Sequence, residues 1–402
     1  MSSRGIRDRV AIIGMGCTRF GEHWDKSTDD LLIDATSEAV ASAGVRLDDI
    51  DAFWLGTQGS GFSGLTLSRP LKLPYKPVTR VENMCATGSE AFRNACYAVA
   101  AGAYDMAMAI GVEKLKDSGF SGLSGATPPS DGTGGFGDIT PPAMFSLLAP
   151  AYCKKYHVES EKMKEVLTRI AWKNHANGAK NPRAQFRKAV AKETICNSPL
   201  VAGPLGIFDC SGVSDGSAAA IIVRAEDAHR YAQKPLYVKA LSFVAGPASG
   251  LIDPDYDYTT FPEVAAAARD AYTQAGVRNP RAELAMAEVH DCFTPTELVL
   301  MEDLGFSERG AAWREALAGA FDLHGDLPVN PDGGLKAFGH PIGASGLRML
   351  FECWLQLRGE APAERTIDTV AAGKKLGLTH NLGGGPGECV SFVSVVGSEP
   401  SA

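Results

Sequence analysis

Short apolar runs alternate with helix-like segments along this chain, which is the pattern of an α/β protein. The segment from Leu31 to Ala43 repeats apolar residues at helical spacing, with Ser27 before it as a start signal and Gly44 after it as a stop signal. The run from Tyr104 to Val112 is almost wholly apolar, as expected for a strand buried on both faces. Because strands and helices alternate, we expect largely parallel strand pairing. Further strands are predicted at 10–14, 52–55, 218–223, 236–244, 284–289 and 389–396.

The order of these elements repeats in the second part of the chain. The helix expected at 263–276 ends on a sequence, Ala271 to Val277, that is similar to Ala39 to Val45 at the end of the first helix. We therefore predict two pseudo-equivalent βα halves, which we assign to residues 1–232 and 233–402.

Composition narrows the possible functions. The chain has 402 residues, enough for two ordinary domains, and its net charge of −8 disfavours a nucleic-acid partner, because phosphate binding needs a basic surface. Residues 1–9 hold no signal-peptide core, and no apolar run is long enough to cross a membrane. The nine cysteines lack paired spacing, so we interpret them as reduced thiols and expect a cytoplasmic protein.

A long central region has a different composition from the two halves. Residues 116–145 are rich in Gly, Ser and Pro, and a loop of this length in a compact domain is usually functional or disordered. Residues 146–192 are helical and basic. A basic helical region of this kind either presents a solvated face or binds a small polyanionic ligand, and the sequence leaves both possibilities open.

Cys85 lies between a predicted extended run, 78–84, and a predicted helix. Thr87 and Glu90 have capping-box spacing, which places the helix start near Thr87. A thiol at a helix N-terminus faces unpaired N–H groups, which favour the reactive thiolate. On this stretch alone, however, a buried structural cysteine is the more common case.

Two further stretches carry reactive groups at corresponding turns of the second half. One is the sequence His290-Asp291-Cys292-Phe293, and the other is the glycine-flanked run from Gly339 to Gly346, which contains His340. Sites in α/β sheets form beyond the carboxyl ends of strands, so two packed halves could bring these groups to Cys85. His290 and Cys292 could instead bind a metal, but no second pair at metal-site spacing accompanies them, and we predict no metal site.

These stretches resemble those of thiolases. The specific feature is the run Gly-His-Pro-Ile-Gly-Ala-Ser-Gly at 339–346, together with Cys85 and the C-terminal glycine run, while His290 to Phe293 resembles the sterol-carrier-protein type of thiolase. The resemblance covers about residues 10–396. It implies a five-layered αβαβα fold, a coenzyme A thioester as substrate, an acyl-cysteine intermediate and no permanently bound cofactor.

The resemblance also implies roles for individual residues. Cys85 matches the nucleophile, and His340 matches the histidine that activates it and polarises a thioester oxygen. His290 stands where most thiolases have an asparagine that holds an oxyanion-hole water. The N–H groups of Cys85 and Gly383 match a second oxyanion hole. Acyl transfer needs such donors beside an activated nucleophile and a base.

The chain departs from the family at one position. Most thiolases have a second cysteine as acid/base where this chain has Asn381, which cannot transfer protons. Cys292 is the expected replacement, although it could also be a core thiol beside Phe293. Cys389 is the next candidate, but it falls within a predicted strand.

The remaining expectations concern function and assembly. Thiolytic cleavage and Claisen condensation are both compatible with these residues. One alternative is a thiolase-like subunit that works with a small zinc-ribbon and OB-fold partner in retro-aldol cleavage or acyl transfer to another acceptor, and another is a non-catalytic acyl-CoA-binding subunit. The resemblance implies a homodimer or a dimer of dimers, with residues 78–84 as the candidate edge strand. His380 is left without a role, and five histidines are predicted to be surface residues: His23, His157, His175, His229 and His324.

Overall fold

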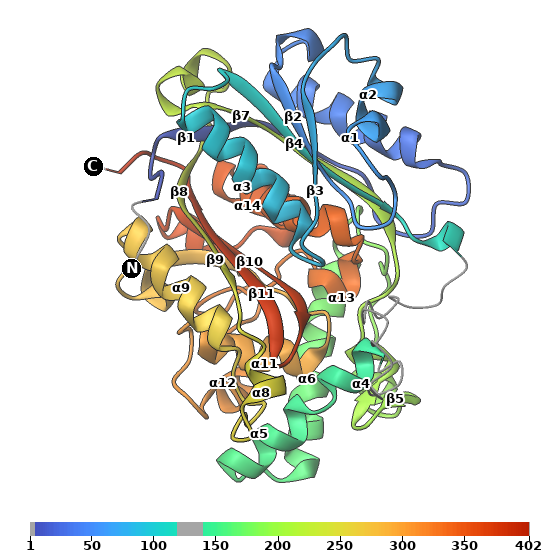
Figure 1. Cartoon of the computed structure of the whole chain (residues 1–402). Coiled ribbons are helices and arrows are strands. Elements are labelled where there is room, and N and C mark those ends of the chain that lie inside the picture. Colours follow the sequence, from blue (N-terminus) through green and yellow to red (C-terminus); the bar gives the residue numbers. More distant parts are fainter. Residues whose placement is uncertain (1–4, 119–139, 402) are drawn as a thin grey trace.

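Nine strands form one mixed sheet in the computed structural model of the chain, which describes residues 5–118 and 140–401 (Figure 1). The strand order is β3-β2-β4-β7-β1-β8-β11-β10-β9. Two short strands, β5 (Leu200–Ala202) and β6 (Leu205–Gly206), form a separate hairpin. The strands of the large sheet are β1 (Val10–Cys17), β2 (Ala52–Gly56), β3 (Val78–Val81), β4 (Met106–Lys114), β7 (Asp215–Arg224), β8 (Leu236–Ala245), β9 (Leu284–Glu288), β10 (Leu376–Gly385) and β11 (Glu388–Gly397).

The sheet contains the same arrangement twice. The order β2-β4-β7-β1 in its first part corresponds to β9-β10-β11-β8 in its second, with the same parallel and antiparallel neighbours. The two parts join where β1 pairs with β8, at Ala11–Tyr237 and Ile12–Leu236. The predicted duplication is therefore visible in the topology. We propose the division at residues 232–233, because β8 has the place in the second half that β1 has in the first.

The expectation of largely parallel pairing is wrong. Only β2–β3, β2–β4 and β9–β10 are parallel, and the other neighbours in the sheet are antiparallel. The glycine run after Asn381 continues β10, where Gly383 pairs with Val390 of β11. The alternation of strands and helices indicates that helices cover a sheet. It does not determine whether neighbouring strands are parallel or antiparallel when hairpins or long connections join them.

Helices and sheet halves form five layers, as predicted (Figure 1). The outer helix α1 (Thr28–Ala43) covers β1 and β7, and the outer helix α9 (Pro262–Ala275) covers β8 and β11. Between the sheet halves lie α3 (Thr87–Ala100) and α14 (Ile342–Arg358), which pack against each other. The predicted limits of α1 are confirmed: the Ser27 side chain accepts from the N–H of Asp30, and Gly44 ends the helix with φ 64°.

The two central helices approach each other closely because glycines lie at their contact. A Cβ on Gly88 of α3 would lie 2.6 Å from the carbonyl oxygen of Gly343, and one on Gly346 of α14 would lie 2.2 Å from Ser89 Oγ. Contacts below 3.0 Å require a neighbour to shift, and because Gly88 faces backbone of the other helix, a larger residue there would push the helices apart. This packing brings the N-terminus of α3, which follows Cys85, beside the N-terminus of α14, which follows His340.

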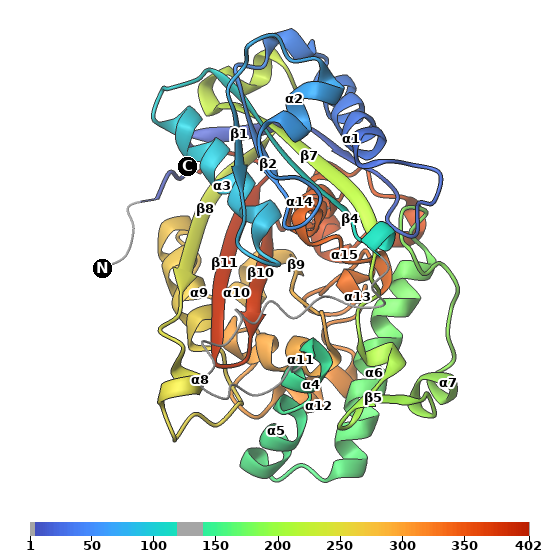
Figure 2. The same cartoon turned by 45° about the vertical axis from the view of Figure 1, so that its right-hand side comes forward.

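A group of helices extends below the second half of the sheet, with α6 packed against α11, α12 and α13 (Figure 2). Within the described residues, none of the helices has the length and apolar character needed to span a membrane. Most of the predicted loop at 116–145 lies outside the described residues. The remaining helices are α2 (Leu65–Leu71), α4 (Pro141–Phe145), α5 (Leu148–Tyr156), α6 (Ser160–Ala179), α7 (Lys192–Cys196), α8 (Ser249–Ile252), α10 (Pro280–Glu283), α11 (Thr294–Asp303), α12 (Ala312–Ala318), α13 (Gly334–Phe338) and α15 (Asp368–Ala371).

Candidate active site

Cys85 sits on a tight turn between β3 and α3. The residue before it, Met84, has φ 49°, a left-handed conformation that is uncommon for a residue with a side chain. The hydroxyl of Thr87 accepts a hydrogen bond of 2.9 Å from the N–H of Asn83, which closes the turn around Cys85. Non-glycine residues in this conformation are frequent at functional sites, where the surrounding structure enforces them.

The helix after Cys85 begins at Thr87, but the predicted capping box is not formed. The Thr87 hydroxyl is used by the turn, and Glu90 instead forms a salt bridge of 2.6 Å with Arg93. The N-cap is Ala86, which offers no side-chain acceptor. The N–H groups of the first turn therefore stay free of a side-chain cap.

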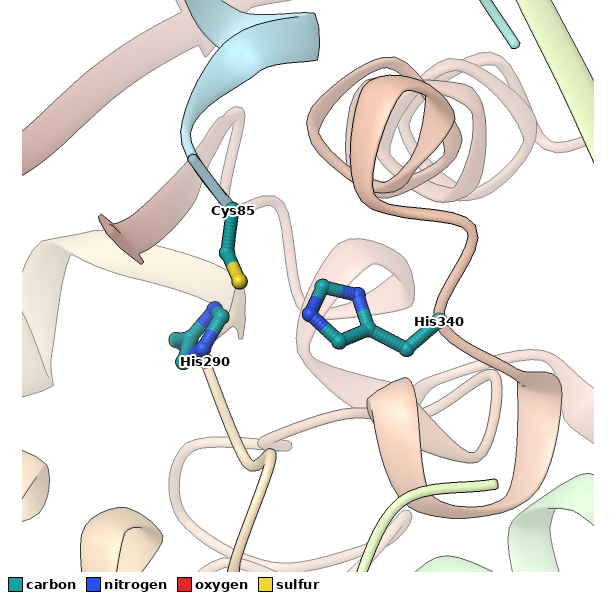
Figure 3. A group of neighbouring side chains, drawn as sticks. All are labelled: Cys85, His290 and His340. Carbon is teal, nitrogen blue, oxygen red and sulfur yellow. The ribbon is translucent and has the colours of Figure 1, made fainter. Parts of the chain in front are cut away.

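Three side chains from distant parts of the sequence meet at this turn. The sulfur of Cys85 and one ring nitrogen each of His290 and His340 all lie within 4.8 Å of one another. Figure 3 shows both imidazoles directed toward the Cys85 sulfur, from the segments after β9 and before α14. The two rings are nearly perpendicular, with centroids 5.3 Å apart. The structure thus brings together the three principal residues named from the sequence.

The hydrogen bonds of Ser345 determine which nitrogen of His340 carries its proton. Ser345 Oγ lies 2.9 Å from the carbonyl oxygen of Pro341, which can only accept, and 2.7 Å from His340 Nδ1. Because the single hydroxyl proton goes to the carbonyl, Ser345 Oγ must accept from an N–H at Nδ1. Nε2 of His340 is then the unprotonated nitrogen; it is buried and has no protein hydrogen-bond partner among the described residues. This leaves a free lone pair available as a base.

Burial keeps the groups of this site neutral. It raises the pKa of the Cys85 thiol to about 12, with the charges of Glu82 and Glu113 adding to the effect. It lowers the pKa of His340 to about 3, with the Arg348 guanidinium contributing, and holds the pKa of His290 well below its usual range. The expected thiolate at the helix start is therefore wrong for the free protein: Cys85 is half-buried, and the desolvation cost of its charge outweighs the helix N-terminus.

The pH dependence of alkylation tests whether Cys85 and His340 are both neutral in the free protein. If the pKa of Cys85 is near 12, its reaction with iodoacetamide in the free protein should rise about tenfold per pH unit from pH 6 to pH 9, because only the thiolate reacts. The rate at Cys85 is measured by mass spectrometry of the peptide that contains it. A rate that levels off below pH 8 would contradict the neutral pair and indicate a thiolate–imidazolium pair.

The motif that contains His290 is fixed by a buried hydrogen-bond network. Asp291 Oδ1 accepts a 2.6 Å bond from the N–H of Leu335 at the start of α13, and its Oδ2 accepts a 2.8 Å bond from Asn174 of α6. Asp291 had no role predicted from the sequence. Its carboxylate connects the segment of His290 to α13, and α13 leads directly to His340. Asp291 therefore helps to fix the positions of the two histidines relative to each other.

Cys292 is buried, with its sulfur 3.9 Å from Thr296 Oγ1. Burial raises its pKa well above the ordinary value, and the neighbouring Cys85 raises it further. Cys292 is therefore a neutral thiol in the free protein, and ionisation of Cys85 would oppose its ionisation further.

The predicted oxyanion-hole glycine lies against the Cys85 turn. A Cβ on Gly383 would be 2.6 Å from the carbonyl oxygen of Asn83 and 3.1 Å from Met84 Cβ, so only glycine fits. Asn381, in the place of the family's second cysteine, accepts a 2.6 Å bond from Ser89 Oγ between the central helices. Cys389 is buried in β11, as predicted, 3.5 Å from Glu263.

A cavity of about 1000 Å³ leads from His340 to the surface. Phe293 and Cys210 line it near the histidine motif, and the exposed residues Arg187 and Lys188 line its open end. Its volume and the two cations that line it suit a large ligand with an anionic end. Other cations of the basic 146–192 region are used structurally, for example Lys173, whose ammonium lies 2.7 Å from the Glu297 carboxylate.

The prediction that His175 is a surface residue is wrong. Its side chain is buried, with only 4% of its surface exposed. It lines the cavity between Phe186 and Phe208, and burial lowers its pKa to about 4. The signal was present in the sequence: His175 follows Ala171 by four residues and shares the apolar face of α6.

Three further residues that support the site were missed in the sequence. Ser345 orients His340, Ser214 Oγ accepts a 3.0 Å bond from the His340 N–H, and Arg348 forms buried ion pairs with Glu288 and Asp332. Arg348 is one turn after Ser345 on a helix with an apolar face, so its burial could have been inferred from the helical period. Ser214 comes from the other half of the chain, and local pattern could not have placed it.

Comparisons with known proteins agree with this geometry. Residues 10–226 match the family described as "Thiolase, N-terminal domain", and residues 250–393 match "Thiolase C-terminal domain-like". An acetyl-CoA acetyltransferase of Methanothermobacter thermautotrophicus is 38% identical over 94% of this chain and 97% of its own length. Sterol carrier protein 2 of Gallus gallus is 31% identical over 97% of this chain and 72% of its own length. A solved "Ltp2-ChsH2(DUF35) aldolase" chain superposes with a TM-score of 0.82 over 98% of each chain, at 24% identity.

The chain belongs to the thiolase superfamily, and it is a thiolase-family acyltransferase. Members of this family act on coenzyme A thioesters. At 24% identity, the likeness to the aldolase chain shows a common fold alone.

Proposed function

We propose that this protein transfers acyl groups between coenzyme A thioesters through an acyl-Cys85 intermediate, either by thiolytic cleavage of a 3-oxoacyl thioester or by the reverse condensation. The observation that carries the proposal is the meeting of Cys85, His290 and His340 within 4.8 Å of one another, with His340 also lining the cavity.

In the cleavage direction, His340 Nε2 takes the proton of the Cys85 thiol as the sulfur attacks the 3-oxo carbon. The negative charge on that oxygen is stabilised by the N–H groups of Cys85 and Gly383. The bond between carbons 2 and 3 then breaks and leaves the enolate of acetyl-CoA, whose thioester oxygen is polarised by His290 and His340. The thiol of a second coenzyme A finally takes the acyl group from Cys85, and His340 returns its proton to the Cys85 sulfur, which restores the enzyme.

The enolate needs a proton, and we assign that step to Cys292. In the free protein its thiol is neutral and buried, and its pKa responds to the charge state of Cys85, so it can act as an acid toward carbon 2. The thiol of the incoming coenzyme A returns the proton to Cys292. Arg187 and Lys188, at the open end of the cavity, would meet the anionic end of coenzyme A.

Product analysis tests the type of reaction. The protein alone is incubated with acetoacetyl-CoA and free coenzyme A, and in parallel with a 3-hydroxyacyl-CoA that bears a tertiary alcohol. Formation of two acetyl-CoA per acetoacetyl-CoA, without cleavage of the hydroxy thioester, is the expected result. Cleavage of the hydroxy thioester to a ketone and a shorter thioester would favour the retro-aldol alternative, and no cleavage of either would contradict the proposal. A series of 3-oxoacyl chain lengths then defines the preferred substrate.

We also propose a cytoplasmic location, because all nine cysteines are free thiols.

We further expect a homodimer formed at the β3 edge of the sheet. β3 is the terminal strand in the sheet order, and Gly64 packs against Val78 of this strand. Beside Gly64 are the exposed apolar residues Phe62 and Leu65, which are 95% and 74% exposed. An exposed edge with adjacent apolar side chains favours pairing with another chain.

Sedimentation at micromolar concentration should therefore show a dimer or a dimer of dimers. Phe62→Asp should shift it toward monomer, whereas Leu251→Asp, a matched change at an exposed leucine elsewhere, should not. A stable wild-type monomer would contradict this prediction.

A further inference from the structure

We propose that Cys85, His290 and His340 form a binding site for a single thiophilic divalent cation of the Zn²⁺ type, and that this ion and the acyl group compete for the Cys85 sulfur. Metal-site spacing is absent from the sequence, because the three donors come from segments about 200 and 50 residues apart and are brought together only by the fold.

The donors have the arrangement that such an ion requires. One sulfur and two imidazole nitrogens lie within 4.8 Å of one another. Donor atoms around tetrahedral zinc lie about 3.5 Å apart, so side-chain rotations that move the donor atoms by about 1 Å would bring all three within binding distance of one ion. Figure 3 shows the three groups converging on one point from three sides. Sulfur with two imidazoles selects Zn²⁺ or Co²⁺ over Mg²⁺ or Ca²⁺, which prefer oxygen ligands.

A second observation points to a ligand at this place. His290 and His340 are each 1% exposed, and each has a ring nitrogen, Nδ1 of His290 and Nε2 of His340, that is buried without a protein hydrogen-bond partner among the described residues. In His340 the proton is fixed on the far nitrogen by Ser345, which is how metal-binding histidines are commonly oriented. His340 also lines the cavity, from which a fourth ligand of the ion would come.

Binding would replace the proton of the thiol: Cys85–SH and M²⁺ give a Cys85–S–M⁺ unit and release H⁺. No oxidation or reduction occurs. With its sulfur bound to the ion, Cys85 could not attack a thioester, so the site would act as a reversible inhibitory site and not as a resident cofactor site. The competition rests on the proposed function, whereas binding itself does not.

Cobalt spectroscopy tests the binding. Co²⁺ is added to the reduced full-length protein in a buffer without thiols or chelators, and absorption is followed in the near ultraviolet and the visible. A thiolate-to-cobalt charge-transfer band that saturates at one ion per chain, and that Zn²⁺ abolishes, is the expected result. Absence of the band in the wild-type protein would overturn the proposal.

Variants locate the ion. Cys85→Ala should abolish the band, and His290→Gln and His340→Gln should each weaken binding by at least about 100-fold, since even changes behind a ligand cost 10–100-fold. Cys210→Ala removes another thiol that lines the same cavity and should leave band and affinity unchanged. Circular dichroism and thermal melting confirm that each variant is folded. A band that persists in Cys85→Ala, or that is lost in Cys210→Ala, would show that the ion binds elsewhere.

The competition is measured separately. Zn²⁺ should block acylation of Cys85 by an acyl-CoA, with recovery after a chelator, and the acylated protein should show no cobalt band. A normal cobalt band in a protein that no thioester acylates would refute the proposed function but leave the metal site standing. Undiminished acylation at saturating Zn²⁺ would refute the competition.

Discussion

Cys85→Ala is expected to lower kcat for acetoacetyl-CoA cleavage by at least about 10⁴-fold and to abolish covalent acylation, because the attacking sulfur is removed and no other nucleophile takes its place. The turn itself should persist, since Met84 and Thr87 hold it through backbone conformation and the Asn83 hydrogen bond. Turnover is measured as acetyl-CoA formed, with circular dichroism as the check on folding.

The control for this prediction is Cys210→Ala. Cys210 is a thiol that lines the cavity together with His340 but lies outside the group of Cys85, His290 and His340. Its removal should change kcat less than about threefold. Normal turnover by Cys85→Ala would contradict the whole mechanism, whereas equal losses in both variants would indicate a general effect of thiol removal on the cavity.

Cys292→Ser is expected to separate proton transfer from acyl transfer. Serine keeps the approximate shape of the side chain and its contact with Thr296, but its hydroxyl is a far poorer proton donor and acceptor near neutral pH than a thiol. The variant should still accept an acyl group on Cys85 from a simple acyl-CoA. It should lose at least about 100-fold in carbon–carbon cleavage and in deuterium exchange at the methyl group of acetyl-CoA.

Asn381→Ala is the matched comparison, because Asn381 has the position of the family's usual second cysteine. Its amide oxygen is used by Ser89 and cannot exchange protons. This variant should therefore retain most of the deuterium exchange, which NMR measures for each protein. Deuterium exchange that survives in Cys292→Ser but disappears in Asn381→Ala would contradict the assignment of the proton transfer to Cys292.

The elements and the reactive residues were largely predictable from sequence, but their spatial relations were not. Ser27 and Gly44 gave the limits of α1 correctly because helix caps are local interactions. Thr87 and Glu90 failed as a capping box because each side chain found another partner, the Asn83 N–H and Arg93. Local spacing cannot show which of two competing hydrogen bonds forms.

The chemistry of the site was also predictable only in part from the sequence. The resemblance around His340 predicted a base beside Cys85, and the structure places it there. The ionisation state was predicted wrongly, because the helix N-terminus is visible in sequence whereas the burial that raises the pKa of Cys85 is a property of the whole fold. The proton position on His340 depends on Ser345 and Pro341, five and one residues away, whose geometry only the start of α14 defines.

The most direct test of the account is to locate the acyl group on the protein. The enzyme is mixed with acetoacetyl-CoA without free coenzyme A, quenched with acid, and analysed by mass spectrometry of the intact chain and of its peptides. The mechanism predicts one acetyl group on the peptide that contains Cys85, absent from Cys85→Ala and removed by free coenzyme A with formation of acetyl-CoA. Product formation with no adduct, or with an adduct on another residue, would contradict an acyl-Cys85 intermediate.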